Sequence, residues 1–222
     1  SWTVPVAVLT GSLVIIPTSA KEHLERLIPN SRLSYDVIGQ LSQEDYLKVS
    51  VSGSHHDLVT ALTQLFQEGH IQVIIGTKSL LGEGWDAPCV NSLILASFVG
   101  SFMLSNQMRG RAIRVWPDNP NKTSNIWHLV SINLSPRRWF DFQDEEEKYD
   151  ETLELQLYAL SPDLDLLDRR MTQFLGLHYQ EPTIESGIDR LDLNQITFSQ
   201  KGLEKLNQNA ITLSQKRQEL KD

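Results

Sequence analysis

The sequence predicts an α/β fold in which a parallel sheet is covered by helices. Short apolar runs of strand length alternate with amphipathic segments of helical length over about residues 10–133. Several runs are apolar on consecutive residues, which is typical of parallel strands that are buried on both faces. Strands that alternate with helices in this way favour right-handed crossovers between parallel neighbours.

The predicted strands are the short apolar runs, taken in chain order. A further short strand is expected over residues 34–38, followed by a polar insertion. The five main predicted strands are Leu13–Pro17, Lys48–Val51, Gln72–Gly76, Ser92–Ala96 and Asn125–Val130.

Three segments between these strands are predicted to be helices. In the middle one, apolar residues recur at i, i+3, i+4, i+7 and i+8 from Leu58, which is the pattern of one helix face. Gly69 is a suitable stop for that helix, because glycine readily adopts the left-handed conformation that ends many helices. The predicted helices are Ala20–Leu27, Asp57–Gln67 and Phe102–Arg114.

Two linked motifs occupy residues 76–114. Residues 76–78 (Gly-Thr-Lys) lead to residues 84–88 (Gly-Trp-Asp-Ala-Pro), and residues 107–114 read Gln-Met-Arg-Gly-Arg-Ala-Ile-Arg. On a helix, Gln107, Arg111 and Arg114 fall on one face. Guanidinium groups match phosphate oxygens in a bidentate way and keep their charge. The stripe therefore indicates a site for an oxyanion.

In this order the two motifs resemble motifs V and VI of superfamily 2 helicases and translocases. Residues 13–19 look like motif IV, and residues 53–77 follow the order usual in the family. The resemblance covers about residues 10–133 and implies a C-terminal RecA-like domain. The Gly-Glu-Gly-Trp-Asp-Ala-Pro string is more similar to bacterial DEAD/DEAH-type and type III restriction-like motors than to the RNA-directed DEAD-box branch. This similarity favours DNA over RNA.

The resemblance implies a nucleotide site. Arg111 and Arg114 would be arginine fingers that stabilise charge on the γ-phosphoryl group of ATP, and Gln107 would lie close by. Gly84 would let the backbone approach the nucleotide, and Asp86 would bind the ribose or order an arginine finger. Without the resemblance, these arginines could be ordinary surface residues and the Gly-x-Asp an ordinary turn.

The resemblance also implies contacts to nucleic-acid phosphates. Thr77 would make such a contact, with help from Lys78. Thr18 and Ser19 follow the first predicted strand, and in a parallel sheet they would share the rim of Thr77 and Gly84, where ligands of α/β sheets bind. As an alternative, Thr18 and Ser19 could cap the helix that begins at Ala20.

The sequence lacks two parts of a complete motor of this family. The 222 residues contain no phosphate loop of the form G-x-x-x-x-G-K-[S/T] and no acidic magnesium-binding box. We therefore expect the second half of a motor, which binds ATP with Mg²⁺ together with a first RecA-like domain and is inactive alone. A non-catalytic protein-interaction module that retains the fold is the alternative, and the intact arginine pair argues against it.

The charge distribution predicts a separate C-terminal region. The net charge is −8, but residues 1–133 carry nine Lys and Arg against ten Asp and Glu. Residues 134–222 carry 11 against 18, and their apolar spacing suits helices. We predict a domain over residues 1–133 and an acidic, mainly helical extension over residues 134–222. The extension is expected not to bind nucleic acid.

Other features favour a cytoplasmic protein without a metal site. The lone Cys89 excludes an internal disulfide. No apolar run approaches the roughly 20 residues that span a bilayer, and the N-terminus does not have the pattern of a signal peptide, so no membrane partner is expected. His55 and His56 are adjacent and have no evident third ligand, so no metal is predicted.

Overall fold

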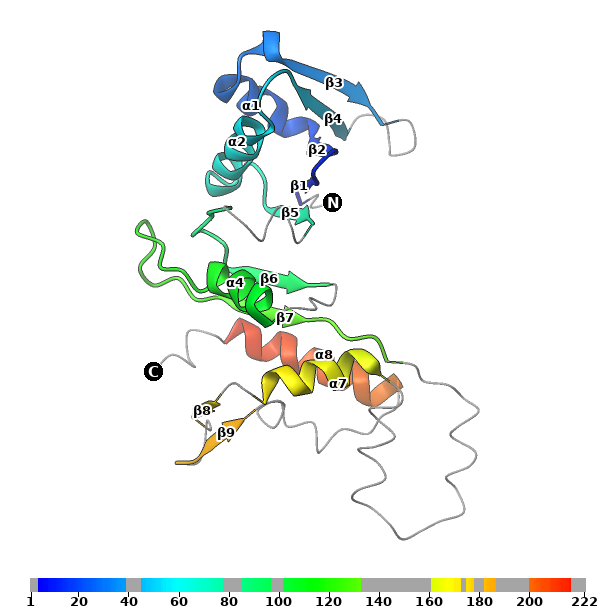
Figure 1. Ribbon diagram of the computed structural model, residues 1–222, viewed down its shortest axis with the longest axis vertical. Coiled ribbons are helices and arrows are strands. Elements are labelled where there is room, and N and C mark those ends of the chain that lie inside the picture. The colour runs from blue at the N-terminus through cyan, green and yellow to red at the C-terminus, as the bar shows by residue number, and fades with distance from the viewer. Residues whose placement is uncertain are drawn as a thin grey trace. The chain divides into compact units, whose positions relative to one another are not determined.

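The computed structural model describes residues 4–38, 45–77, 85–96, 102–132, 161–172, 175–177, 182–186 and 200–216. Over these residues the chain is a mixed α/β protein with one five-stranded sheet, two two-stranded sheets and five α-helices (Figure 1). Two compact units are present, of which the first comprises residues 1–91 and 103–122 and the second residues 92–102 and 123–222. The predicted boundary at residues 133 and 134 lies at the edge of an undescribed stretch and stays a prediction.

The five-stranded sheet of the first unit is mostly antiparallel. Its strand order is β3-β4-β2-β1-β5, and only β1 and β5 pair in parallel. The sequence pattern predicted a parallel sheet, and the observed strand directions differ from that prediction. The strands are β1 (Val6–Leu9), β2 (Val14–Pro17), β3 (Leu33–Val37), β4 (Tyr46–Val51) and β5 (Val73–Gly76).

A tight hairpin between β1 and β2 explains much of the difference. Strand β1 was not among the predicted strands. The hydroxyl of Thr10 accepts a hydrogen bond from the N–H of Leu13 at 2.9 Å, and the N–H of Thr10 donates to the carbonyl of Leu13 at 2.9 Å. A connection this short cannot cross over the sheet, so β2 must run antiparallel to β1. Thr-Gly-Ser between two apolar runs was the available hairpin signal.

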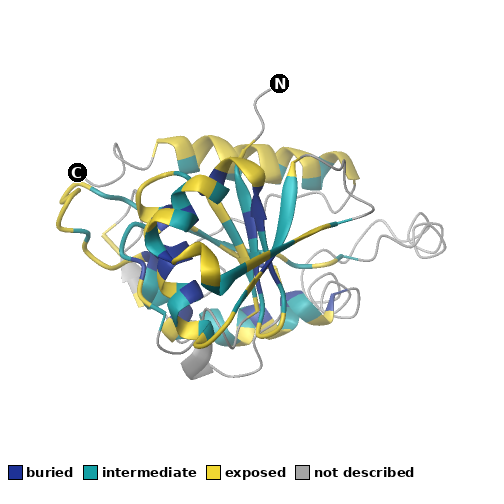
Figure 2. Ribbon diagram, turned by 90° about the horizontal axis from the view of Figure 1, so that it is seen from above, coloured by how far each residue is buried: buried dark blue, intermediate teal, exposed yellow. Residues whose placement is uncertain are grey.

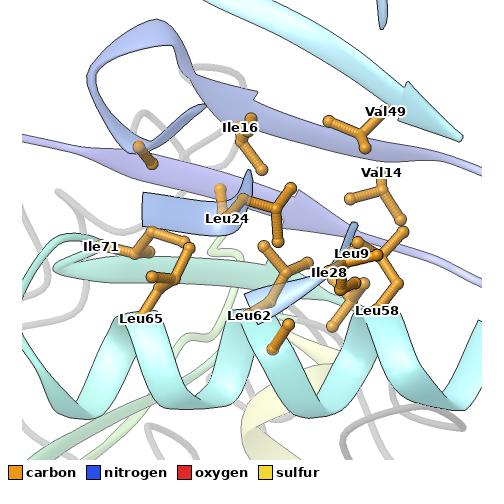
Figure 3. Packing of buried hydrophobic residues seen from close by; sticks show 13 residues of the cluster. Leu9, Val14, Ile16, Leu24, Ile28, Val49, Leu58, Leu62, Leu65 and Ile71 are labelled. Atoms are coloured by element: carbon orange, nitrogen blue, oxygen red, sulfur yellow. The ribbon is translucent and has the colours of Figure 1, made fainter. Parts of the chain in front are cut away.

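Helices α1 (Lys21–Leu27) and α2 (His55–Gln67) pack on one face of this sheet. Burial alternates along β1, so alternate side chains enter the core. Figure 3 shows apolar side chains of α2 directed at those of the strands and α1, and Figure 2 shows the buried positions. On β5, Ile75 is 55% exposed. The buried cluster comprises Ala7, Leu9, Val14, Ile16, Ala20, Leu24, Ile28, Val49, Leu58, Ala61, Leu62, Leu65 and Ile71.

Both ends of α2 have local hydrogen bonds that fix its length. The hydroxyl of Ser54, at the N-cap, accepts from the N–H of His56 at 3.2 Å. Gly69 has φ of 82°, and the N–H of His70 donates to the carbonyl of Leu65 at 2.9 Å. This is the Schellman arrangement, so the predicted glycine stop is confirmed. His55 lies in the first turn of α2.

The remaining elements of the first unit are one helix and two short 3₁₀ turns. Most of α4 (Phe102–Ala112) belongs to this unit. The turns are η1 (Thr18–Ala20) and η2 (Asn30–Arg32). Each strand and helix that was predicted in this unit is found in the structure, with bounds that differ by a few residues.

The second unit combines a parallel strand pair with elements from the predicted extension. Strands β6 (Ser92–Leu95) and β7 (Asn125–His128) pair in parallel. Two helices follow, α7 (Pro162–Met171) and α8 (Gln200–Gln215), in agreement with the helical spacing. A short antiparallel pair, β8 (Leu175–Leu177) and β9 (Ile184–Ser186), was not predicted.

Polar contacts join both helices of the extension to the segment around β7. Ser161, the N-cap of α7, donates from its hydroxyl to the carbonyl of Ser131 at 2.8 Å. Asp163 accepts from the N–H of Ser131 at 3.2 Å. The side-chain amide of Asn125 donates to the carbonyl of Ser214 in α8 at 3.3 Å. In the described part of the chain, no helix has the length and apolar character needed to cross a membrane.

Candidate functional site

The second motif lies on helix α4 and on the residues just after it, and one side of the helix is buried. Met108 and Ala112, one turn apart, are buried, whereas Gln107 is exposed and Arg111 half-buried. The α-helix ends at Ala112, two residues before the predicted end. The backbone then makes one further turn, because the N–H of Arg114 donates to the carbonyl of Arg111 at 3.4 Å. The two arginines therefore stay close together.

The two motifs meet at an ion pair. Arg114 donates from Nη1 to Oδ1 of Asp86, so the end of the second motif contacts the loop of the first. Both side chains are at least half exposed, at 50% for Arg114 and 65% for Asp86. An ion pair in water contributes little to folding, so its importance lies in where it holds the guanidinium.

The charges around Arg111 favour an anion. Burial lowers the pKa of Arg111, and the neighbouring positive charge of Arg114 lowers it further, whereas the carboxylate of Asp86 raises it. The guanidiniums of Arg111 and Arg114 and the carboxylate of Asp86 are thus close enough to influence one another. An anionic ligand would relieve the repulsion between the arginines, and phosphate oxygens fit their donor geometry.

The loop of the first motif is anchored to α2 through Trp85. The indole N–H of Trp85 donates to Oγ1 of Thr63 at 2.8 Å, and that hydroxyl donates to the carbonyl of Val59 at 2.7 Å. Ala87, two residues after Trp85, is buried. Trp85 is half-buried, and this directional hydrogen bond holds its indole ring at α2.

Lys122 is a residue of this site that the sequence motifs did not indicate. Its ammonium group donates to the carbonyls of Pro88 at 2.6 Å, Val90 at 2.9 Å and Ala112 at 2.9 Å. Two of these carbonyls belong to the loop after Asp86 and the third ends α4. The acceptors are backbone groups distant in sequence, so no local pattern announces the contact.

The predicted nucleic-acid residues are only partly placed. Thr77 directly follows β5 and is exposed. Because Leu9 pairs with Gly76 in parallel, Thr77 lies at the edge where β1 also ends. Lys78 and Gly84 lie outside the described residues.

Thr18 and Ser19 do not share the rim of Thr77, which corrects the expectation from the sequence. Strand β2 starts at that rim, where Val14 pairs with Leu9, and it runs antiparallel to β1. Its last residue, Pro17, therefore lies at the opposite end of the sheet, and the N–H of Thr18 donates to the carbonyl of Asp45 there at 2.9 Å. The prediction assumed parallel strands, and the hairpin reverses β2.

The alternative role of Thr18 and Ser19 as helix caps also differs from the observed geometry. Both residues form the 3₁₀ turn η1, and the N-cap position of α1 is occupied by Ala20, which has no side chain able to cap. The described residues contain no group of three or more His, Cys, Asp or Glu side chains arranged to hold a metal ion.

No protein-family model matches this chain, and no curated protein matches it significantly. The resemblance to superfamily 2 motors therefore rests on the sequence motifs alone.

Proposed function

We propose that this chain is the second motor domain of an ATP-dependent nucleic-acid helicase or translocase, with a RecA-like architecture. The observation that carries the proposal is the ion pair between Asp86 and Arg114. It joins two segments whose sequences separately resemble the nucleotide-binding motifs of these motors. The parallel pairs β1–β5 and β6–β7 are the elements on which the RecA-like assignment rests.

Arg111 and Arg114 would act on the γ-phosphoryl group of ATP bound by a partner domain. Charge spreads over the phosphoryl oxygens in the transition state, and a guanidinium held nearby stabilises that charge. Asp86 would keep Arg114 oriented before the nucleotide arrives, so little reorganisation is needed during the reaction. Magnesium, held by the partner domain, would neutralise charge on the β- and γ-phosphates.

Thr77 would contribute to the nucleic-acid track. It follows the carboxyl end of β5, the edge at which ligands of α/β sheets are usually bound. A hydroxyl can donate to a phosphate oxygen without reading the base, so the contact would be independent of sequence. The motif strings favour DNA as the substrate over RNA.

The arginine assignment can be tested in the complete motor, which includes the first RecA-like domain. Arg111→Ala and Arg114→Ala should each lower kcat for ATP by roughly 10³- to 10⁵-fold, which is the usual contribution of an arginine finger to the rate. The KM should change only a few-fold, since the loss falls on the transition state. Arg26→Ala, on the exposed side of α1, is the matched control.

Arg114→Lys adds a second criterion, because a point charge cannot reproduce the fork of a guanidinium. It should recover only part of the rate. Parental turnover in either alanine variant would remove that residue from the catalytic assignment.

The proposed track is tested by nucleic-acid stimulation of the ATPase. Thr77→Ala should weaken the stimulation similarly for different sequences and leave basal hydrolysis unchanged, whereas Thr77→Ser should retain it because the hydroxyl remains. A sequence-dependent loss, or an equal drop in basal hydrolysis, would contradict the role of Thr77.

A further inference from the structure

Lys122 connects the two motif segments through three backbone carbonyls. An ammonium group has three N–H donors, and each of them has an acceptor here, at 2.6 Å from Pro88 and 2.9 Å from Val90 and Ala112. The side chain is half-buried, and burial lowers its pKa. The nearby Cys89 acts in the opposite direction and raises it.

The carbonyl of Ala112 is a favourable acceptor for a cation. It lies at the C-terminal residue of α4, at the negative end of the helix dipole. Ala112 is fully buried, so water has little access to the residue. The ammonium of Lys122 therefore fixes the end of the helix just where Arg111 and Arg114 project.

The carbonyls of Pro88 and Val90 fix the other segment. They flank a turn in which the N–H of Val90 donates to the carbonyl of Ala87 at 3.1 Å. Ala87 and Val90 are buried, so this part of the loop has a rigid base. Asp86 immediately precedes that base. Movement of the base would move its carboxylate.

The ion pair between Asp86 and Arg114 spans the same two segments but is exposed to solvent. Exposed ion pairs hold their partners weakly, because water and salt compete with them. The contacts of Lys122 are partly buried and directional. The ion pair is therefore suited to break or shift when a ligand binds. Lys122 is suited to keep Asp86 and Arg114 close to each other.

We propose that Lys122 is a positioning residue that holds the loop of Asp86 against the end of α4 and so sets the place of Arg114. The geometric part of this proposal stands on the contacts above. Its consequence for catalysis rests on the proposed function as a motor. The two parts can be tested separately.

The geometric test uses the 222-residue chain and needs no ATPase. Asp86→Cys and Arg114→Cys are introduced with Cys89→Ser, so that the ion pair is gone and the two thiols report proximity. A short bis-maleimide reagent should join them readily when Lys122 is present. With Lys122→Met added, the cross-linking rate should fall at least about fivefold, because the stem remains but all three donors are lost.

Lys48→Met is the matched control, since Lys48 contacts Asp36 at 3.7 Å elsewhere in the same unit. It should leave the cross-linking rate unchanged. An unchanged rate in a folded Lys122→Met protein, judged by circular dichroism, would overturn the proposal. If that variant does not fold, Lys122→Arg is used, which keeps the charge but cannot aim at three separate carbonyls. It should lower the rate two- to threefold, and a parental rate would again overturn the proposal.

The catalytic test uses the complete motor. Lys122→Met should lower kcat about 10- to 100-fold with KM changed less than threefold, since a displacement of about 1 Å can lower a rate by 10². In the Arg114→Ala background it should add little, because the residue that it positions is absent. If the fall in kcat of the double variant equals the product of the two single falls, Lys122 does not act through Arg114 and has only a structural role. If Arg114→Ala itself has no effect while cross-linking depends on Lys122, the motor assignment fails and the positioning role stands.

Discussion

The sheet region over residues 4–77 and the motif segments over residues 85–90 and 107–122 are held together in different ways. The sheet region depends on a continuous apolar cluster between five strands and two helices. The motif segments combine a smaller set of buried apolar residues with a few directional contacts, made by Trp85, Lys122 and the exposed pair of Asp86 with Arg114. Apolar packing is insensitive to exact direction, whereas hydrogen bonds and ion pairs specify where a group points. We therefore expect the apolar cluster to determine the stability of the fold and the directional contacts to determine the geometry of the candidate site.

The largest expected effect on stability comes from the apolar cluster. Leu62→Ala should lower the free energy of unfolding by about 2–5 kcal/mol, because Leu62 is fully buried and its truncation leaves a cavity. Ile75→Ala, at an exposed position of β5, should cost less than about 1 kcal/mol. Urea unfolding followed by circular dichroism would compare them. Similar losses at the two positions would break the contrast between the regions.

Trp85 links the two regions, so its removal should have an intermediate effect. Trp85→Phe keeps an aromatic ring but leaves Oγ1 of Thr63 without its donor at 2.8 Å. The expected loss is about 0.5–1.5 kcal/mol, the usual net contribution of one hydrogen bond. Thr63→Val should cost less in this background than in the parent, because the bond from the indole is already absent and only the bond to the carbonyl of Val59 is newly lost. Additive losses would show that the bond does not connect the residues energetically.

The exposed ion pair should matter least for folding. Arg114→Ala in the 222-residue chain should change the free energy of unfolding by less than about 1 kcal/mol, and added salt should reduce even that difference. The same substitution is expected to reduce the turnover of the complete motor strongly. A large loss of stability would make Arg114 part of the scaffold and weaken its assignment as a finger.

The last effect is absent at neutral pH and concerns the pH dependence of the sheet region. Burial, reinforced by the nearby charge of Glu25, raises the pKa of Tyr35 in β3 from 10.0 to about 12. The unfolded chain therefore loses this proton first, and the contribution of Tyr35 to stability should fall as pH rises from about 10 to about 12. Unfolding at pH 9 and pH 11 should show a smaller decrease for Tyr35→Phe than for the parent. Equal decreases would contradict the shift.

The two regions also differ in what the sequence could predict. The spacing from Leu58 along α2 and the stop at Gly69 are local patterns, and both are present in the structure. The hairpin at Thr10 was missed, because the strand before it was not recognised and the following apolar run was taken for a parallel strand. That omission placed Thr18 at the wrong end of the sheet.

In the motif segments, helical spacing singled out Arg114, whereas Asp86 was singled out only through resemblance to a family. The end of α4 was placed two residues too late, because nothing between Ala112 and Arg114 breaks a helix by composition. Lys122 could not be found, since its acceptors are backbone carbonyls that any residue supplies. Its importance depends on the tertiary arrangement.

The strand connections of the five-stranded sheet imply an order of folding. Leu9 and Val14 meet across a short turn, and the hairpin can close early because little chain entropy is lost. Val6 meets Val73 only after the intervening strands and helices have been arranged, so β5 should dock late and detach first. Amide hydrogen exchange in native conditions should therefore be faster in β5 than in β2. If so, Thr77 is carried by the part of the sheet that opens most readily, and its presentation can respond to a bound partner without unfolding the core.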